Sequence, residues 1–577
     1  STHLILDLMA AGLLIGSNNR DYAELSFTKQ RSIIKQYGVG IVSLIILCGF
    51  LLACVAAVTV RYSICQKDDI LVKPAIVSSP DGDNLIEYSP QIEAVKEQLQ
   101  YGRAFDRNGV LLAKPVTVGK SEYPLGDALF FWTGYDYSKA LWSGTNPKNP
   151  YGVLAAPRYL SYMRGFDNEP HRVKVTSHYQ RSPFMPSKRV VHTDTLMQYN
   201  YSVLLPFIND PALVDEFNQS QSNRNIYLSV DSDLQLKIIE AAQTFFINNV
   251  KSLTSQSRVT AVIIDAATGD VLATPCWPGP NIDRILGMAE NKQYVYKDDL
   301  DGFQAFAHMD LAMYPTPPGS IMKLFVAVAG LRRIGPDMEQ HTEVVYLPEL
   351  IYHRGDTRRT GRKTLKGSLR ESNNIYFIKT LNNLDLYGEY GRLCWECGVP
   401  FDGLLPYGLY SDEIATNKKM FDEAINKART IGLDKWAIYK DSGEHRKLND
   451  HEWGYAWGQS ISASPLSVAR LVGAIGNGGV LMESRFCSKD SIRIKEVLLT
   501  EEEAGIMQSA MQYQAKGSFG LLSSTIGAKT GTPERAFQNG KMNDAWHTFF
   551  ILGEETTNKH PIAVCVRLER VNATSSI

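Results

Sequence analysis

The stretch Pro317-Pro318-Gly319-Ser320-Ile321-Met322-Lys323-Leu324-Phe325 places a serine and a lysine at the start of an apolar run that continues to Leu331. The run predicts a buried helix that begins near the serine. Ser320 and Lys323 are three positions apart, so on that helix they lie on one face within reach of each other. A lysine beside an apolar core loses water, which favours its neutral amine, and a neutral amine can take the serine's proton. The stretch therefore predicts a nucleophile and its base.

The S-x-x-K pattern is weak on its own, because it should arise by chance about twice in a chain of this length. It occurs three times in these 577 residues. The other two matches begin at Ser26 and Ser32, in a short polar segment with no apolar core beside it. The prediction for Ser320 therefore depends on what else the chain carries.

The composition limits the class of protein. A chain of 577 residues is too long for one compact core, so two or three domains are expected. With 60 basic and 61 acidic residues and no basic run, the chain is not expected to bind nucleic acid. Cys394 and Cys397 have C-x-x-C spacing, but no second pair accompanies them, so buried or surface thiols are expected. The sequence predicts no metal and no cofactor.

An uncharged apolar segment, Gly40–Val60, predicts a transmembrane helix, since its 21 residues span about 31 Å at ~1.5 Å per residue. Basic residues gather before it, whereas Arg61 and Lys67 after it are followed by Asp68 and Asp69. The positive-inside rule then puts the N-terminal side in the cytoplasm and the rest of the chain outside. A cleaved signal peptide is the alternative, but the span is long and lies far from the start.

The chain beyond the span changes in texture near residue 220. Residues 62–220 are rich in aromatics, Gly and Pro and predict a β-rich pedestal domain, with a hairpin at Asn108-Gly109. Residues 221–577 begin with a strand, a helix and a hairpin, and end with three short apolar strands. We therefore expect an α/β (α+β) domain with an antiparallel sheet flanked by helices. Its first helix should bury the face formed by Leu234, Ile238, Ala241 and Phe245.

Two further motifs follow Ser320. Ser372-Asn373-Asn374 is an S-x-N pattern, and Lys529-Thr530-Gly531 is a K-T-G pattern in a predicted strand, with Thr532 after it. S-x-N is weak, since Ser17-Asn18-Asn19 matches it as well, whereas K-T-G occurs once. Taken singly, the first motif could be a helix cap and a turn, and the second an ordinary edge strand.

The order S-x-x-K, S-x-N, K-T-G resembles the signature of penicillin-binding proteins and serine β-lactamases. The segment GRAFDRNGVLLA, residues 102–113, is similar to a segment of class B penicillin-binding proteins, although Tyr101 and Ala104 depart from its pattern. Further similarity lies at Gly458-Gln459, Ser464-Pro465-Leu466 and Asn477-Gly478-Gly479, with serine in place of threonine at 464 and of glutamine at 467. The resemblance runs from about residue 100 to about residue 570 and implies the penicillin-binding transpeptidase fold.

The resemblance implies a D,D-transpeptidase that crosslinks peptidoglycan stem peptides and is inhibited by β-lactam antibiotics. Ser320 would attack the carbonyl between the two terminal D-alanines, and Lys323 would take its proton. Ser372 would relay a proton to the leaving amine, and Asn374 would hold the substrate's amide.

The K-T-G segment would bind the substrate. Lys529 would supply positive charge for the substrate carboxylate, with Thr530 and Thr532 as hydroxyl donors next to Gly531. The backbone N–H groups of Ser320 and Thr532 would form the oxyanion hole.

The resemblance also implies an order along the chain: a cytoplasmic segment (1–37), a transmembrane helix (38–61), the pedestal (62–220) and the transpeptidase domain (221–577). The catalytic part would lie outside the bacterial cytoplasmic membrane. The first run, THLILDLMAAGLLIGSNNR, weakly resembles the last helix of SEDS-family polymerases, which suggests a SEDS-family glycosyltransferase as partner, fused in a longer parent chain. An interfacial helix or a tag remnant explains the run equally well. The family also has a helix after its last strand, so ending at Ile577 should leave one sheet face partly bare.

Three alternatives share the motifs. A β-lactamase is usually a compact domain without an anchor or a pedestal, and a β-lactam sensor needs a large cytoplasmic signalling part. A catalytically silent regulator of a polymerase would keep the fold without the activity. The intact motifs argue against this last reading, and an activity measurement separates it from an enzyme.

Overall fold

The computed structural model describes residues 27–65, 67–78, 84–117, 120–133, 159–166, 171–180, 189–250, 252–254, 257–279, 310–346, 360–399, 450–520, 524–537 and 540–572. The chain divides into two compact units. The first comprises residues 1–98 and 168–215, and the second comprises residues 99–167 and 216–577.

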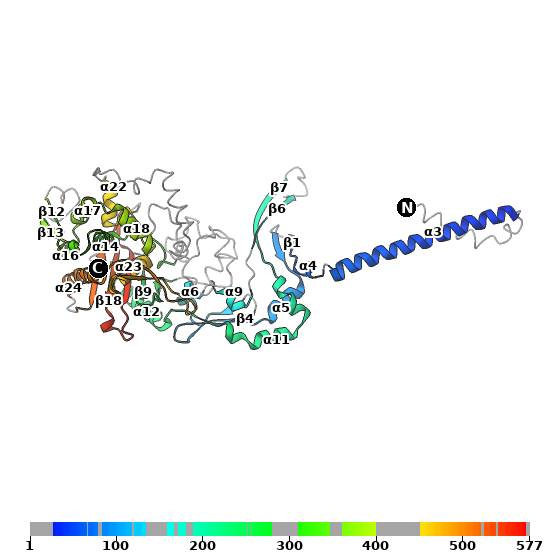
Figure 1. The fold of residues 1–577 in the computed structure, drawn as a ribbon, viewed down its shortest axis with the longest axis horizontal. Coiled ribbons are helices and arrows are strands. Elements are labelled where there is room, and N and C mark those ends of the chain that lie inside the picture. The colour runs from blue at the N-terminus through cyan, green and yellow to red at the C-terminus, as the bar shows by residue number, and fades with distance from the viewer. Residues whose placement is uncertain are drawn as a thin grey trace. The chain divides into compact units, whose positions relative to one another are not determined.

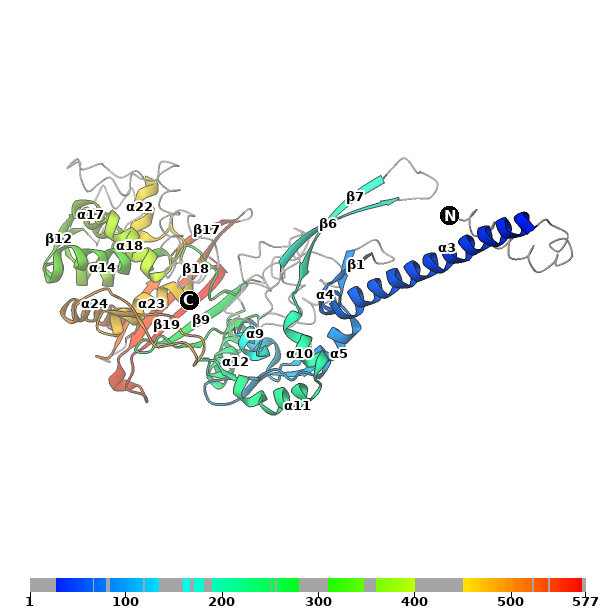
Figure 2. The ribbon, with the colours of Figure 1, turned by 45° about the vertical axis from the view of Figure 1, so that its right-hand side comes forward.

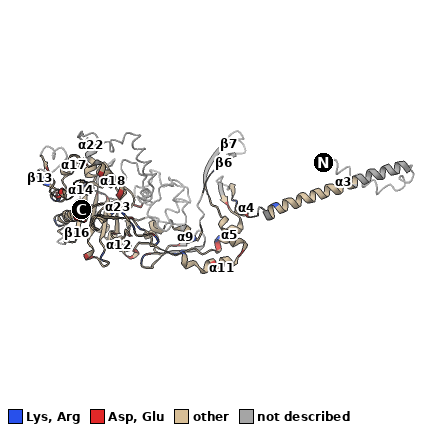
Figure 3. Cartoon of the chain, in the orientation of Figure 1, with Lys and Arg blue, Asp and Glu red and all other residues tan. Residues whose placement is uncertain are grey.

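The first unit contains a long helix, α3 (Phe27–Val60), drawn in blue in Figure 1. Within it and the turn that follows, Val42–Ser63 is long and apolar enough to cross a membrane, and none of it is buried. In Figure 3 the coloured part of α3 is almost entirely tan, the colour of residues other than Lys, Arg, Asp and Glu. Its length and composition make this segment a candidate membrane span. Among the described residues, it is the one helix of this kind.

The rest of the first unit is built from two hairpins and short helices. Strands β1 (Ala75–Ser78) and β2 (Asn84–Glu87) pair antiparallel, as do the longer β6 (His171–Gln180) and β7 (Arg189–Gln198). The helices are α4 (Lys67–Val72), α5 (Pro90–Gln98), α10 (Leu205–Asn209) and α11 (Ala212–Gln219), the last of which continues into the second unit.

A small sheet opens the second unit, in the order β5-β4-β3-β8. Its strands are β3 (Ala104–Phe105), β4 (Leu111–Thr117), β5 (Lys120–Glu122) and β8 (Ile226–Tyr227). The hairpin predicted at Asn108-Gly109 joins β3 to β4. Buried Asp106 closes this turn, because its Oδ1 accepts the N–H groups of Asn108 and Val110 at 2.8 Å. Its Oδ2 accepts a hydrogen bond from the hydroxyl of Ser232 at 2.7 Å. This bond joins the turn to the first residue of the helix α12 (Ser232–Asn248).

The central sheet joins the first and the last strands of residues 221–577, as the sequence predicts. Its antiparallel order is β10-β9-β19-β18-β16, with β11 on β9 and β17 on β18. The strands are β9 (Arg258–Asp265), β10 (Val271–Ala273), β11 (Cys276–Trp277), β16 (Ile526–Gly531), β17 (Glu534–Phe537), β18 (Gly540–Ile551) and β19 (Ile562–Asn572). Strand β16, which carries the K-T-G residues, ends this path and so forms an edge.

The two faces of this sheet bury different helices, because successive side chains of a strand point to opposite faces. Helix α12 (Ser232–Asn248) packs Leu234 and Ile238 on the face that contains Ile263 and Val564. The prediction that this helix buries Ala241 is wrong, because Ala241 is exposed. The helix buries Gln235 instead, whose side-chain amide bonds the backbone of Ala128 and Thr274. An apolar pattern cannot reveal a glutamine buried for its hydrogen bonds.

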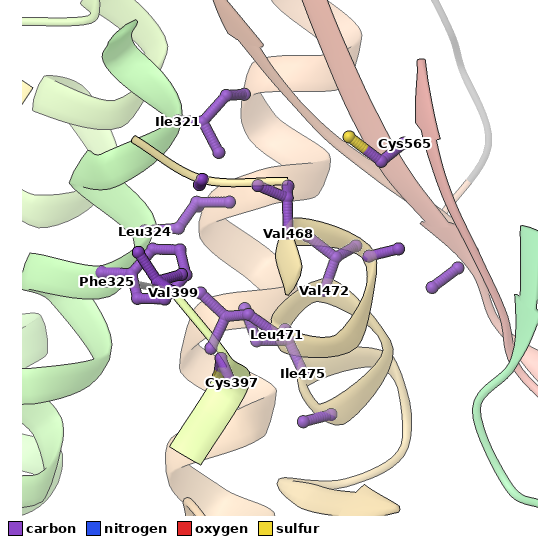
Figure 4. Close-up of a cluster of buried hydrophobic side chains, with 14 of the residues drawn as sticks. Ile321, Leu324, Phe325, Cys397, Val399, Val468, Leu471, Val472, Ile475 and Cys565 are labelled. Carbon is purple, nitrogen blue, oxygen red and sulfur yellow. The ribbon is translucent and has the colours of Figure 1, made fainter. Parts of the chain in front are cut away.

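The other face carries α23 (Pro465–Gly476), of which every residue is buried. Figure 4 shows Val468, Leu471, Val472 and Ile475 of α23 between the sheet and the helix α14 (Met322–Ile334). Around α14 lie α17 (Asn374–Asn383), α18 (Tyr387–Cys397) and α22 (Asp450–Trp457), which stay together in both views (Figures 1 and 2). This core holds α14 rigidly, and with it the residues at its start.

Helix α24 (Glu501–Phe519) packs on β16 and on α16 (Leu365–Glu371). The remaining elements are α6 (Phe130–Thr133), α9 (Leu160–Arg164) and the strand pairs β12 (Thr342–Val345) with β13 (Gly361–Thr364) and β14 (Val480–Met482) with β15 (Ile494–Val497).

Candidate active site

Ser320 lies in a 3-10 turn, Gly319–Ile321, that leads directly into α14. The predicted position of the serine at the start of a buried helix is therefore confirmed. Gly319 adopts a φ of +59°, a conformation that side chains disfavour, and so allows the chain to turn sharply into the helix. Ser320 itself is half-buried.

Lys323 is wholly buried and its amine contacts three oxygen atoms. Its Nζ lies 2.9 Å from Ser320 Oγ, 2.5 Å from the backbone carbonyl of Ser372 and 3.0 Å from Ser372 Oγ. An ammonium group has three N–H donors, which is enough to serve these three oxygen atoms. The three-residue spacing predicts a direct contact between Ser320 and Lys323, and the structure contains this contact.

Ser372 lies between two helices, after α16 and before α17. It ends α16 with a φ of +53°, which is unusual for a residue other than glycine and often marks a functional site. The side chain of Asn373 caps α17, with its Oδ1 accepting the N–H of Tyr376 at 3.0 Å. The middle residue of the motif therefore does the capping, which leaves the Ser372 hydroxyl for the lysines. Asn374, half-buried, is the first residue of α17.

Lys529 brings the third motif to the same hydroxyl. It lies on β16 and is wholly buried, with Nζ 3.2 Å from Ser372 Oγ and 2.7 Å from the carbonyl oxygen of Thr530. One serine hydroxyl thus accepts from two lysines that are far apart in the sequence. Hydrogen bonds connect Ser320, Lys323, Ser372 and Lys529 into one network.

The end of β16 packs against the backbone that precedes Ser320. A Cβ added to Gly531 would lie 2.3 Å from the carbonyl oxygen of Pro318, and one added to Gly319 would lie 3.1 Å from the backbone N of Thr532. The side chain of Thr532 is exposed, and that of Thr530 is half-buried. Glycines at 319 and 531 therefore allow the two backbones to approach, which brings the Thr532 N–H near the peptide of Ser320.

Arg567 belongs to none of the three motifs, yet it holds the segment that leads to Ser320. This wholly buried arginine on β19 donates to the carbonyl oxygens of Leu311 at 2.9 Å and Tyr314 at 2.7 Å, and to the hydroxyl of Thr316 at 3.2 Å. It thereby fastens residues 310–316, the segment that leads to Ser320, onto the sheet. The signal in the sequence is an arginine inside an apolar strand, a position where charge persists only with partners.

His547 on β18 stands opposite Thr530 in the strand register. Burial, and secondarily the positive charge of Lys529, lowers the pKa of His547 below its ordinary value of 6.5. This imidazole is therefore held in its neutral form beside the site. Within the described ranges, no group of three or more His, Cys, Asp or Glu side chains could hold a metal ion.

The chain belongs to the penicillin-binding protein transpeptidase family, since the family model for the penicillin binding protein transpeptidase domain matches residues 259–576. Among solved structures it is similar to penicillin-binding protein A from M. tuberculosis. For the ceftriaxone acyl-enzyme complex the identity is 15% and the TM-score 0.50, covering 82% of this chain and 93% of that one. For the penicillin G acyl-enzyme complex the values are 16% and 0.51, covering 82% and 94%. No curated protein sequence matches. At these identities the similarity establishes the fold.

Proposed function

We propose that this protein is a serine D,D-transpeptidase that crosslinks peptidoglycan stem peptides through an acyl-enzyme on Ser320. The observation that carries the proposal is the network in which Lys323 contacts both Ser320 Oγ and Ser372 Oγ, while Lys529 shares the latter. Such a network connects a nucleophile, a base and a proton relay, the minimal set for acyl transfer.

Acylation begins at Ser320. Its Oγ attacks the carbonyl carbon between the last two residues of a D-Ala-D-Ala peptide, and its proton passes to Lys323 Nζ. This step needs the neutral amine, in which case the 2.9 Å contact runs from the hydroxyl to the nitrogen. Lys323 is wholly buried beside Ser320 and shares Ser372 Oγ with Lys529, so its amine is placed to take this proton.

The leaving group departs with a proton. Ser372 accepts from both lysines through its oxygen, so its own O–H remains to donate to the amine nitrogen of the departing D-alanine. Ser372 then recovers a proton from Lys323 as the carbon–nitrogen bond breaks. An amine from a neighbouring stem peptide next attacks the acyl carbon, the ester bond breaks, and the amine's proton returns to Ser320. The side chain of Asn374 holds the substrate's amide in place.

The edge strand binds the rest of the substrate. Lys529, with the hydroxyls of Thr530 and Thr532, attracts the terminal carboxylate, while Gly531 keeps the strand edge close to the serine turn. The N–H groups of Ser320 and Thr532 stabilise the oxyanion of the tetrahedral intermediate. β-lactams would acylate the same serine, because their strained amide takes the place of the D-Ala-D-Ala bond.

We further propose that α3 anchors the protein in the bacterial cytoplasmic membrane, with residues 62–220 as a pedestal and residues 221–577 as the catalytic domain outside it. Of the proposed pedestal, residues 99–167 belong to the same compact unit as the catalytic domain. The unburied apolar segment Val42–Ser63 supports the anchor. A SEDS-family glycosyltransferase, which polymerises the strands to be crosslinked, is the proposed partner.

The test uses the purified full chain in detergent, a synthetic pentapeptide ending in D-Ala-D-Ala as donor, and a D-amino acid as acceptor. Mass spectrometry follows the free D-alanine and the exchanged peptide. We expect exchange that disappears in Ser320→Ala. Hydrolysis without exchange would instead indicate an enzyme that, like a β-lactamase, passes its acyl group to water. No turnover by folded protein would indicate a silent partner of the polymerase.

A further inference from the structure

Gly458, which directly follows α22, packs its backbone against the turn that carries the nucleophile. Its carbonyl oxygen accepts the N–H of Gly319 at 3.1 Å. Its φ is +78°, and a Cβ added to it would lie 2.1 Å from the carbonyl oxygen of Gly319. Real Cβ atoms do not approach a backbone oxygen so closely, so any side chain at 458 must displace the Gly319 peptide.

The Gly319 carbonyl and the Ser320 N–H belong to one planar peptide group. A push on that carbonyl oxygen therefore tilts the N–H of Ser320, which has no freedom to turn on its own. Gly458 contacts the carbonyl end of this peptide group, and the N–H at its other end is the proposed oxyanion donor.

A second segment also packs closely against this turn. A Cβ on Gly319 would lie 2.9 Å from the backbone N of Pro533 and 3.1 Å from that of Thr532, and one on Gly531 would lie 2.3 Å from the carbonyl oxygen of Pro318. Both Gly458 and residues 531–533 therefore limit how far the Gly319–Ser320 peptide can move.

We propose that Gly458 is a positioning residue, which fixes the direction of the Ser320 N–H toward the oxyanion of the tetrahedral intermediate. This inference rests on the proposed function, in which Ser320 is acylated and its N–H stabilises the negative oxygen. Gly458 does not touch substrate. It acts through the Gly319–Ser320 peptide, and it comes from a segment that belongs to none of the three motifs.

A matched control exists in the same unit. Gly479, after α23, has a φ of +93°, and a Cβ added to it would lie 2.2 Å from the carbonyl oxygen of Leu499. Gly479→Ala therefore introduces the same kind of strain as Gly458→Ala, a positive φ together with a clash against a backbone carbonyl, but against a carbonyl outside the active site. The two variants should lose similar amounts of thermal stability.

The experiment measures acylation of the full chain by penicillin G at several concentrations, which separates the dissociation constant of the first complex from the acylation rate constant. We expect Gly458→Ala to lower the rate constant by about 10²-fold, as for loss of an oxyanion donor, with little change in the dissociation constant. Gly479→Ala should keep the wild-type rate constant. A boronic acid that forms a tetrahedral adduct with Ser320 should lose affinity in Gly458→Ala and not in Gly479→Ala.

A second variant separates the clash from the backbone conformation. Asn tolerates a positive φ better than Ala but still carries a Cβ, so Gly458→Asn should be as slow as Gly458→Ala. Partial unfolding lowers the acylated fraction and leaves the rate constant unchanged, so the comparison survives a loss of stability. A wild-type rate constant in either Gly458 variant would overturn the inference. Absence of acylation in the wild-type protein would instead overturn the proposed function.

Discussion

Two pairs of residues with the same three-residue spacing occur on packed helices of this protein, and they have opposite chemistry. Ser320 and Lys323 stand at the start of α14, and Cys394 and Cys397 stand in the last turn of α18. The two helices are joined by Arg332 of α14, which forms ion pairs with glutamates of α18. Both pairs are therefore rigidly held in one core.

The surroundings of the two pairs differ. Lys323 meets hydroxyl and carbonyl oxygens from its own turn and from the S-x-N segment. The two cysteines are wholly buried, and burial raises the pKa of Cys397 to about 12 and that of Cys394 well above its ordinary value. Spacing brings two side chains together, but the polar groups that other segments supply decide whether the pair can react.

Removing the proposed base tests the reactive pair most severely. Lys323→Met keeps the volume of the buried side chain but removes the amine, so acylation by a fluorescent penicillin should slow by about 10²- to 10⁴-fold. The time course of covalent label measures this rate. Lys366→Met, at an exposed lysine of α16, should keep the wild-type rate. A Lys323→Met protein that is acylated at nearly the wild-type rate would show that the amine is not the base.

The polar partner supplied by the S-x-N segment is the next test. Ser372→Ala removes the oxygen shared by both lysines, so acylation should slow by about 10²-fold, near the lower end expected for a proton-transfer group. Ser368→Ala in α16 is the control, since that buried hydroxyl has no hydrogen-bond partner among the described residues. Equal rates for the two variants would mean that the Ser372 hydroxyl takes no part.

Altering the unreactive pair should leave acylation unchanged. Cys394→Ala and Cys397→Ala each remove a buried sulfur atom and should lower the free energy of unfolding by about 1 kcal/mol, without changing the acylation rate. In the native protein both thiols should react with a thiol reagent much more slowly than in denaturant, because the thiolate is disfavoured by burial. Rapid labelling of the native protein would contradict the contrast between the two pairs.

The smallest expected effect concerns pH. Because the pKa of His547 is lowered in the folded protein, the unfolded chain binds this proton more readily, and stability should fall as the pH drops through 6.5. His547→Gln lacks this contribution, so its melting temperature should fall less than that of the wild type between about pH 7.5 and about pH 5.5. Identical pH profiles would show that His547 is not held in its neutral form by the fold.

The parts of the fold that the sequence predicts are those with local causes. Short apolar runs identify β9, β18 and β19, and the turn chemistry of Asn108-Gly109 identifies its hairpin. The meeting of Ser320 with the other two motifs is expected from the order of the motifs, because that order is the family's and the family shares one fold. The strands and the hairpin need no knowledge of distant contacts.

The parts that the sequence does not reveal depend on which distant segments meet. Arg567 is explained by carbonyl oxygens of residues 311 and 314, and Gly458 by the carbonyl of Gly319. No periodicity or spacing encodes such contacts.

Formation of a covalent acyl-enzyme on Ser320 is tested most directly by exposing the purified chain to a fluorescent penicillin and looking for label after denaturation. We predict label on the wild-type protein and on Ser32→Ala, which alters another S-x-x-K match, and none on Ser320→Ala. Label that persists in Ser320→Ala, or a folded wild-type protein that takes up none, would contradict the account.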